Sequence, residues 1–241
     1  MKQLQILENL LFNFYLLKGF KMTIESNKNS KISLFLGGGQ SGKSIFAENC
    51  AKKWENVLFY ATGGQIENSP EWELRIKKHR ERRPSHWLTM EYPIEIEDVI
   101  KMSEEKKVDI VLIDCLTLWM GWQISKSVQN YTQVQLLKHL EMEYQHFIKQ
   151  LWKFKCPILV VSNEVGEGVI PGSETGRIFR EALGAMNLAL GEISQCITFS
   201  IAGQNLLLKS SKNKFIDGFC STGIINENFI FSELNNNPNL E

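Results

Sequence analysis

The residues from 37 to 44 have the types and spacing needed to bind the phosphates of a nucleotide. They read GGGQSGKS and fit the phosphate-loop pattern G-x-x-x-x-G-K-[ST], between a run that predicts a short buried strand and a run that predicts a helix. Backbone N–H groups of such a loop point at phosphate oxygens, and the helix adds its positive N-terminal end. We expect Lys43 to reach the outer phosphates and the Ser44 hydroxyl to bind Mg²⁺. A glycine-rich turn without a ligand is the alternative, which the combined strand, spacing, Lys and Ser disfavour.

One acidic residue is in the right place to complete this centre. Asp114 ends the strongly apolar run 108–114, which predicts a buried strand. In P-loop enzymes an acidic side chain at such a strand end holds Mg²⁺ directly or through water. We therefore predict that Asp114 is catalytic and that Ser44 and Asp114 are the Mg²⁺ ligands. An Asp that only ends a strand and begins a turn is the simpler alternative.

The most basic part of the chain contains a histidine. Six of the nine residues 75–83 are Lys or Arg, a pattern typical of a solvated helix face or a nucleic-acid contact. Arg75, His79 and Arg82 or Arg83 are spaced at i, i+4 and i+7 or i+8, so they share one face of a helix. A neutral imidazole flanked by guanidinium groups is suited to attack phosphorus. From spacing alone, a surface histidine is the simpler interpretation of His79.

The other histidines and one polar pair are weaker candidates. His86 precedes a tryptophan and is expected to pack or to orient a turn, although it is the fallback nucleophile. His139 and His146 lie on a long predicted helix without acidic or thiol companions, so we expect no metal site there. Asn163 and Glu164 follow a buried strand, where open α/β sheets place their ligands, so we expect them in the wall of the site.

The elements that position these residues alternate between strand and helix. We expect strands at 31–36, 57–62, 87–91, 108–114, 157–162, 196–202 and 206–209. We expect helices at 45–51, 70–83, 94–107, 129–153 and 177–193. This order predicts an α/β fold with a mostly parallel sheet that has helices on both faces.

The composition bounds the class of protein. The 241 residues suit one α/β domain or two small ones, with 43% hydrophobic and 22% charged residues and a formal net charge of zero. A net charge of zero provides no field that recruits nucleic acid or an anionic membrane. Five dispersed cysteines without a C-x-x-C pair indicate reduced thiols and a cytoplasmic protein.

Both ends of the chain are expected to lie outside the catalytic domain. Residues 4–20 are rich in Leu and Phe, but polar residues interrupt the run, which is too short for a membrane span. A true start at Met22 and an amphipathic partner-binding helix remain open for this segment. We divide the chain into an N-terminal extension (1–30), a P-loop domain (31–212) and a C-terminal tail (213–241).

A series of motifs between residues 32 and 209 resembles the bifunctional adenosylcobinamide kinase / adenosylcobinamide-phosphate guanylyltransferase family of cobalamin biosynthesis. The phosphate loop is shared by many families, whereas the blocks 79–91 and 163–180 are much more specific. The matching elements in chain order are the loop 38–44, Tyr60-Ala61-Thr62, Arg75-Ile76 with His79, Arg83-Pro84, His86-Trp87, Thr89, Glu91, the strand end 112–117, the stretch from Ser162 through Pro171, Gly176-Arg177 and Phe179-Arg180.

This resemblance implies a covalent mechanism. His79 corresponds to the family histidine that takes up GMP from GTP. The resemblance also implies a RecA-like P-loop fold and homo-oligomers, namely trimers, whose subunits share sites. Gln40 stands where the family commonly has Arg, and Gly63 where Ser is frequent, but neither change removes a catalytic group. From the loop and the resemblance together, the expected nucleotide-binding residues are Gly38, Gly39, Gln40, Ser41, Gly42, Lys43, Ser44, Ile45, Ala61, Thr62, Gly63, Arg80, Glu81, Arg82, Arg83, Glu91 and Asp114.

We therefore interpret the chain as a bifunctional enzyme of adenosylcobalamin biosynthesis with catalytic residues Lys43, His79 and Asp114. With Mg²⁺ as cofactor, it is expected to phosphorylate adenosylcobinamide with ATP or GTP. It is then expected to transfer GMP from GTP to adenosylcobinamide phosphate through guanylylated His79, giving adenosylcobinamide-GDP. One alternative is a P-loop small-molecule kinase in which His79 only binds phosphate. The other is a RecA-like nucleic-acid-binding ATPase, which the neutral net charge disfavours.

Overall fold

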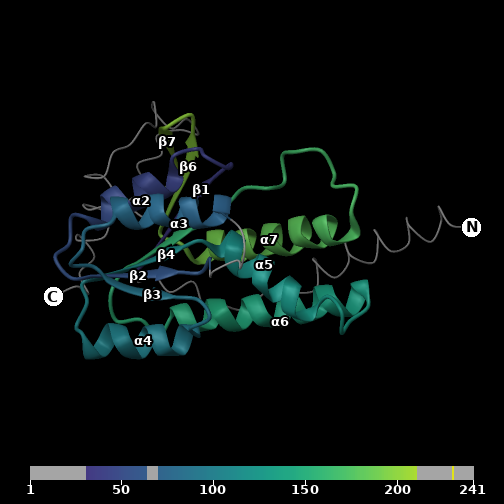
Figure 1. Ribbon diagram of the computed structural model, residues 1–241, viewed down its shortest axis with the longest axis horizontal. Helices are drawn as coiled ribbons and strands as arrows, with labels where there is room; N and C mark the ends of the chain where they lie inside the picture. Colours follow the sequence, from purple (N-terminus) through teal and green to yellow (C-terminus); the bar gives the residue numbers. More distant parts are fainter. Residues whose placement is uncertain (1–30, 64–69, 211–229, 231–241) are drawn as a thin grey trace, which may run out of the picture.

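A seven-stranded sheet forms the centre of the computed structural model, which describes residues 31–63, 70–210 and 230 (Figure 1). The strand order is β3-β2-β4-β5-β1-β6-β7. All neighbouring strands are parallel except β6 and β7, which form an antiparallel pair at one edge. In chain order the strands are β1 (Ile32–Gly37), β2 (Val57–Ala61), β3 (Leu88–Glu91), β4 (Ile110–Asp114), β5 (Ile158–Val161), β6 (Cys196–Ile201) and β7 (Gln204–Ser210).

The parallel register aligns the carboxyl ends of the strands along one edge. Ala61 at the end of β2 pairs with Asp114 at the end of β4, and Asp114 pairs in turn with Val161 of β5. Strand β5 lies between β1, which leads into the phosphate loop, and β4, which carries Asp114. These observations confirm the predicted α/β fold with a mostly parallel sheet. Residues that follow β1, β2, β4 and β5 therefore gather at one edge of the sheet.

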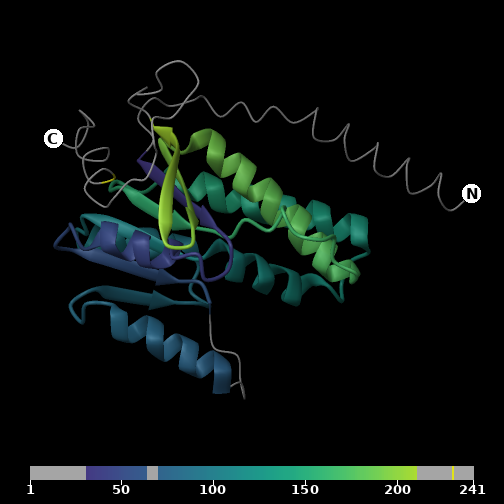
Figure 2. The ribbon, with the colours of Figure 1, turned by 90° about the horizontal axis from the view of Figure 1, so that it is seen from above.

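Helices cover both faces of this sheet and bury two apolar clusters. The bounds of the helices are α2 (Lys43–Ala51), α3 (Pro70–Arg82), α4 (Ile96–Glu105), α5 (Leu116–Ser127), α6 (Gln133–Leu151) and α7 (Glu174–Ile193). Alternate side chains of β1 divide between the clusters: Leu34 belongs to the cluster that includes α4 to α7, whereas Phe35 packs against Phe46 of α2 in the other. Figure 2 shows α3 beside the β3 end of the sheet, far from the β6–β7 hairpin.

One helix was not predicted from the sequence. Helix α5 follows β4 directly, and its residues Leu116, Trp119, Met120 and Ile124 are buried at helical spacing. Leu118 and Trp122 add apolar residues to its other side, so the run lacks the polar face that marks an amphipathic helix. The helix predicted at 129–153 is shorter in the structure, where α6 spans Gln133–Leu151. It begins after Thr132, whose side chain forms a capping box with Gln135.

The structure describes four of the five cysteines and one residue of the C-terminal tail. Cys50 and Cys196 are buried free thiols, Cys115 and Cys156 are partly buried free thiols, and Cys220 lies outside the described residues. Ile230 is fully buried in the cluster that contains Phe35 and Phe46. The proposed N-terminal extension and the rest of the tail lie outside the described residues. Among the helices that the structure describes, none is long and apolar enough to cross a membrane.

Candidate active site

The phosphate loop joins β1 to α2 and has a conformation that its glycines permit. Gly42, which precedes α2, has a φ of 98°, a value that side chains with a Cβ rarely adopt. A Cβ on Gly37 would come within 2.5 Å of the carbonyl oxygen of Ser200, so that position has no room for a side chain. The Lys43 ammonium donates a hydrogen bond to the Gly38 carbonyl at 2.9 Å, which places it across the loop. The loop therefore has the geometry of a phosphate-binding turn.

Asp114 lies directly beside the first turn of α2. The Ser44 hydroxyl donates a hydrogen bond to Oδ1 of Asp114 at 3.2 Å. The two residues meet because the strand order places the ends of β1 and β4 at the same edge of the sheet, with only β5 between them. Burial raises the pKa of the Asp114 carboxyl, and the negative charge of Glu48 raises it further, whereas Ser44, Arg83 and Lys43 act in the opposite direction. A carboxylate destabilised in this way would be compensated by a bound cation. Hydroxyl and carboxylate oxygens are also the ligand types that Mg²⁺ prefers.

His79 joins this centre from α3. A ring nitrogen of His79 and carboxylate oxygens of Glu48 and Asp114 all lie within 4.8 Å of one another. Arg82, one helical turn after His79, forms two hydrogen bonds with Glu48, at 3.2 Å from Nε and 3.0 Å from Nη2, and Nη2 also lies 3.0 Å from Nδ1 of His79. The three donor groups could hold a cation, but here the Arg82 guanidinium supplies the positive charge. The predicted nucleophile is therefore next to the predicted Mg²⁺ ligand.

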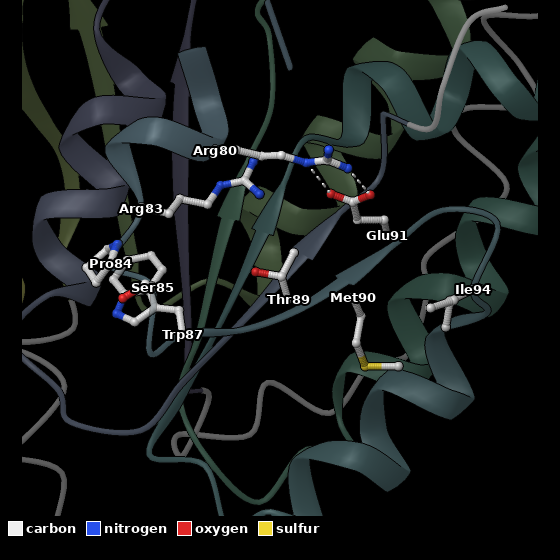
Figure 3. Close-up of a pocket in the computed structure, with 9 residues that line it drawn as sticks. All are labelled: Arg80, Arg83, Pro84, Ser85, Trp87, Thr89, Met90, Glu91 and Ile94. Atoms are coloured by element: carbon white, nitrogen blue, oxygen red, sulfur yellow. Dashed lines mark hydrogen bonds and ion pairs between the residues drawn. The ribbon is translucent and has the colours of Figure 1, made fainter. Parts of the chain in front are cut away.

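A pocket of about 550 Å³ lies along β3, and Arg80 and Arg83 from the end of α3 and the turn after it are among its lining residues (Figure 3). Arg80 forms an ion pair with Glu91 at 2.6 Å, and Figure 3 shows the pair facing each other at one end of the pocket. The Arg83 guanidinium lies 3.5 Å from the centre of the Phe59 ring. Burial lowers the pKa of Arg83, and its Nε is buried without a hydrogen-bond partner. An anionic ligand would satisfy that unpaired donor, so Arg83 fits a phosphate-binding role.

The ends of β2 and β5 form further walls of the site. Thr62 is fully buried, and its hydroxyl donates to the carbonyl of Cys115, so it fixes the turn after β4. The Gly63 carbonyl accepts a hydrogen bond from the indole of Trp122 at 3.0 Å. After β5, the Glu164 N–H donates to the Gly37 carbonyl at 3.1 Å, which ties this loop to the phosphate loop.

Some predicted residues lie away from the cluster. Glu81 is exposed and pairs with Lys77 at 3.9 Å on the outer side of α3, and Ile45 is 47% exposed. His86 is exposed beyond the end of α3. Of the positions where the sequence departs from the family pattern, Gln40 is exposed at the tip of the loop with a φ of 57°.

The two histidines of α6 have acidic companions, although the sequence analysis assigned them none. His146 lies 2.7 Å from Glu97 of α4, and His139 lies 3.9 Å from Glu143 one turn along the same helix. The interpretation that they lack acidic neighbours was therefore wrong. Glu97 comes from another helix, whereas Glu143 follows His139 at the i, i+4 spacing of one helix face and was overlooked. Each is a pair only: within the described ranges, the one trio of possible metal ligands is Glu48, His79 and Asp114.

Sequence reasoning missed two contributors to the site. Glu48 is only 1% exposed, although it carries a charge, and it lies one turn after Ser44 on α2. That i, i+4 spacing from the predicted Mg²⁺ ligand is the signal that identifies it. Arg180 was quoted only as part of a motif, and the structure shows that it donates to the carbonyls of Gly166 and Gly168 and so holds the loop after β5.

The chain is similar to one protein family and to relatives that share a single description. Residues 33–208 match the family model described as cobinamide kinase / cobinamide phosphate guanyltransferase. A bifunctional adenosylcobalamin biosynthesis protein, CobP of Pseudomonas aeruginosa, is 34% identical over 176 residues, which are 73% of this chain and 96% of the relative. CobU of Escherichia coli, with the same description, is 28% identical over 181 residues, 73% of this chain and 98% of the relative. A solved KaiC-like protein of Pyrococcus horikoshii covers 78% of this chain and 82% of its own at 10% identity and a TM-score of 0.38, a similarity too low to bear on function.

Proposed function

The chain belongs to the cobinamide kinase / cobinamide phosphate guanyltransferase family, and on that premise we propose that the cluster around Asp114 carries both of its activities. The enzyme phosphorylates adenosylcobinamide with a nucleoside triphosphate. It then transfers GMP from GTP to adenosylcobinamide phosphate, which gives adenosylcobinamide-GDP. The observation that supports one shared centre is the proximity of His79 to Asp114, because Asp114 also bonds Ser44 of the phosphate loop.

The phosphate loop serves the kinase reaction. Its N–H groups and the N-terminal end of α2 bind the phosphates, and Lys43 offsets the negative charge on the transferred group. Ser44 and Asp114 would hold Mg²⁺, and their 3.2 Å separation and hard oxygen donors fit that ion. Bound there, Mg²⁺ would supply positive charge that stabilises the transferring phosphoryl group. Because the backbone N–H groups of the phosphate loop bind the triphosphate, which ATP and GTP share, either nucleotide can serve as the phosphate donor.

His79 serves the guanylyl transfer as the nucleophile. A ring nitrogen attacks the α-phosphorus of GTP, the bond to the β-phosphate oxygen breaks, and pyrophosphate leaves with the bonding electrons. The phosphate of adenosylcobinamide phosphate then attacks the same phosphorus and the nitrogen–phosphorus bond breaks. Arg82 and Arg83 flank the reacting group and offset its charge. Arg80, Glu91 and the turn at Gly63 line the rest of the nucleotide site.

Three further points follow from family membership and the sequence. We place the catalytic domain at residues 31–212, with an N-terminal extension and a C-terminal tail on either side. We propose a homo-oligomer, namely a trimer, whose subunits share sites, and a cytoplasmic location. Sedimentation equilibrium measures the mass of the assembly directly, and a monomer at micromolar concentration contradicts the oligomer.

Labelling with GTP that carries ³²P at the α-phosphate tests the role of His79. We expect label on the wild-type protein that acid removes and base preserves, as for a histidine phosphoramidate, and no label on His79→Ala. His86→Ala is the matched control, since His86 is exposed and outside the cluster, and it should label at the wild-type rate. Thermal unfolding confirms that each variant is folded. Retention of label by His79→Ala, or its loss from His86→Ala alone, rejects this assignment and places the nucleophile at another residue. Absence of label on the wild-type protein favours a kinase in which His79 only binds phosphate.

A further inference from the structure

Glu48 is a charged side chain in a buried position on the helix that follows the phosphate loop. Its residue is 1% exposed, and both of its carboxylate oxygens accept hydrogen bonds from Arg82, at 3.0 and 3.2 Å. A bidentate contact fixes the plane of the guanidinium as well as its position. Glu48 therefore links α2, which carries the phosphate loop, to α3, which carries His79.

The same guanidinium fixes the protonation of His79. Nη2 of Arg82 lies 3.0 Å from Nδ1 of the imidazole. An arginine side chain has only donors, so Nδ1 must be the acceptor and must carry the lone pair. In a neutral imidazole the proton is then on Nε2. The arrangement selects one tautomer, and Glu48 holds the residue that selects it.

We propose that Glu48 is a positioning residue for guanylyl transfer, acting through Arg82 to hold His79 as the Nε2–H tautomer, so that the bond to GMP forms at Nδ1. This inference rests on the proposed role of His79 as nucleophile. In the structure the Nδ1 lone pair accepts a hydrogen bond from Arg82. Before attack, the Arg82 N–H must turn from Nδ1 to an oxygen of the GTP α-phosphate, which frees the lone pair. Arg82 can release Nδ1 and remain bound to Glu48 through its Nε.

The covalent step balances without any further reactant. The Nδ1 lone pair forms the nitrogen–phosphorus bond, and the bond to the β-phosphate oxygen breaks as pyrophosphate leaves with its electron pair. The ring keeps its Nε2 proton and becomes positively charged. The carboxylates of Glu48 and Asp114, which have oxygens within 4.8 Å of a ring nitrogen, stabilise that charge. When GMP passes to adenosylcobinamide phosphate, the electron pair returns to Nδ1 and the neutral Nε2–H ring is restored.

The first test identifies the labelled nitrogen in the wild-type protein. After reaction with GTP, the protein is unfolded in alkali and digested, and NMR couplings between phosphorus and the ring atoms identify the isomer of the modified histidine. We expect the Nδ1-linked isomer. An Nε2-linked adduct on His79 overturns this inference and leaves the proposed function intact, whereas absence of any adduct on His79 rejects the proposed function itself. The measurement needs no variant, so it does not depend on the folding of a mutant.

The second test is a double-mutant cycle on the rate of protein labelling at saturating GTP. We expect Glu48→Gln to slow labelling by about tenfold, because Arg82 loses the charged partner that holds it, and Arg82→Gln by at least as much. Residues that act as one unit have non-additive effects. The double variant should then label within about twofold of Arg82→Gln alone. Glu55→Gln, the same substitution at an exposed position just after α2, is the control and should label at the wild-type rate. If the two single losses multiply in the double variant, Glu48 does not act through Arg82.

Discussion

Replacing Arg82 with alanine should destabilise the protein because it leaves the buried Glu48 carboxylate without its counter-charge. The Glu48 side chain is 2% exposed and that of Arg82 is 35% exposed, so the pair lies between a buried and a surface ion pair. Removal of one partner costs about 3–5 kcal/mol for a fully buried pair, whereas exposed pairs contribute about 0–1 kcal/mol. Water can reach the Arg82 side of the gap and solvate the carboxylate in part. We therefore expect a loss of about 2–3 kcal/mol, at least a thirty-fold change in the unfolding equilibrium.

Urea denaturation of the protein without nucleotide measures this loss, and two variants test its cause. Lys77→Ala removes an ion pair on the same helix whose side chains are 72% and 62% exposed, so it should cost less than about 0.5 kcal/mol. Glu48→Gln combined with Arg82→Ala removes the stranded charge and should be more stable than Arg82→Ala alone by at least about 1 kcal/mol. A loss below 0.5 kcal/mol for Arg82→Ala, or a double variant no more stable than that single one, refutes the reasoning.

Three other outcomes are expected from the same centre and from two partly buried thiols. Lys43→Ala should weaken calorimetric binding of a GTP analogue by at least about tenfold without unfolding the protein, and unchanged affinity contradicts the role of the phosphate loop. The pKa of Asp114 is raised above its unfolded value, so the native state binds more protons above the ordinary Asp range and stability falls as pH rises through that window. Asp114→Asn should therefore be more stable than wild type at pH 7, and the difference in stability should shrink towards pH 4. Its turnover should fall by about 100-fold or more. Lower stability than wild type at pH 7, or near-normal turnover, contradicts these roles of Asp114. Partial burial raises the pKa values of Cys115 and Cys156 to about 11, so iodoacetamide at pH 8 should modify both about tenfold more slowly than in urea, as peptide mass spectrometry would show. Equal rates in the two conditions contradict this shielding of the thiols.

The sequence by itself determined the phosphate loop and the order of most strands and helices. These features depend on local rules: a glycine-rich turn between a strand and a helix, apolar runs for buried strands, and helical periodicity. The spacing of His79 and Arg82 also placed them on one face of α3, and the structure brings them to 3.0 Å. Helix α5 was not predicted, because it is apolar on more than one side and its burial depends on helices distant in the sequence.

Only the tertiary structure decided which side chains meet across elements. The motifs predicted Ser44 and Asp114 as ligands of one ion, but the strand order that brings them to 3.2 Å, with β5 between β1 and β4, is set by long-range packing. The structure also separates Arg82, which turns inward to Glu48, from its neighbour Glu81, which pairs with Lys77 on the solvent side. Residues adjacent in a helix point about 100° apart, so the docking angle of α3 alone decides which of them reaches the site. A buried Glu48 is tolerable only because that docking supplies a guanidinium, and this compensation is a property of the assembled fold.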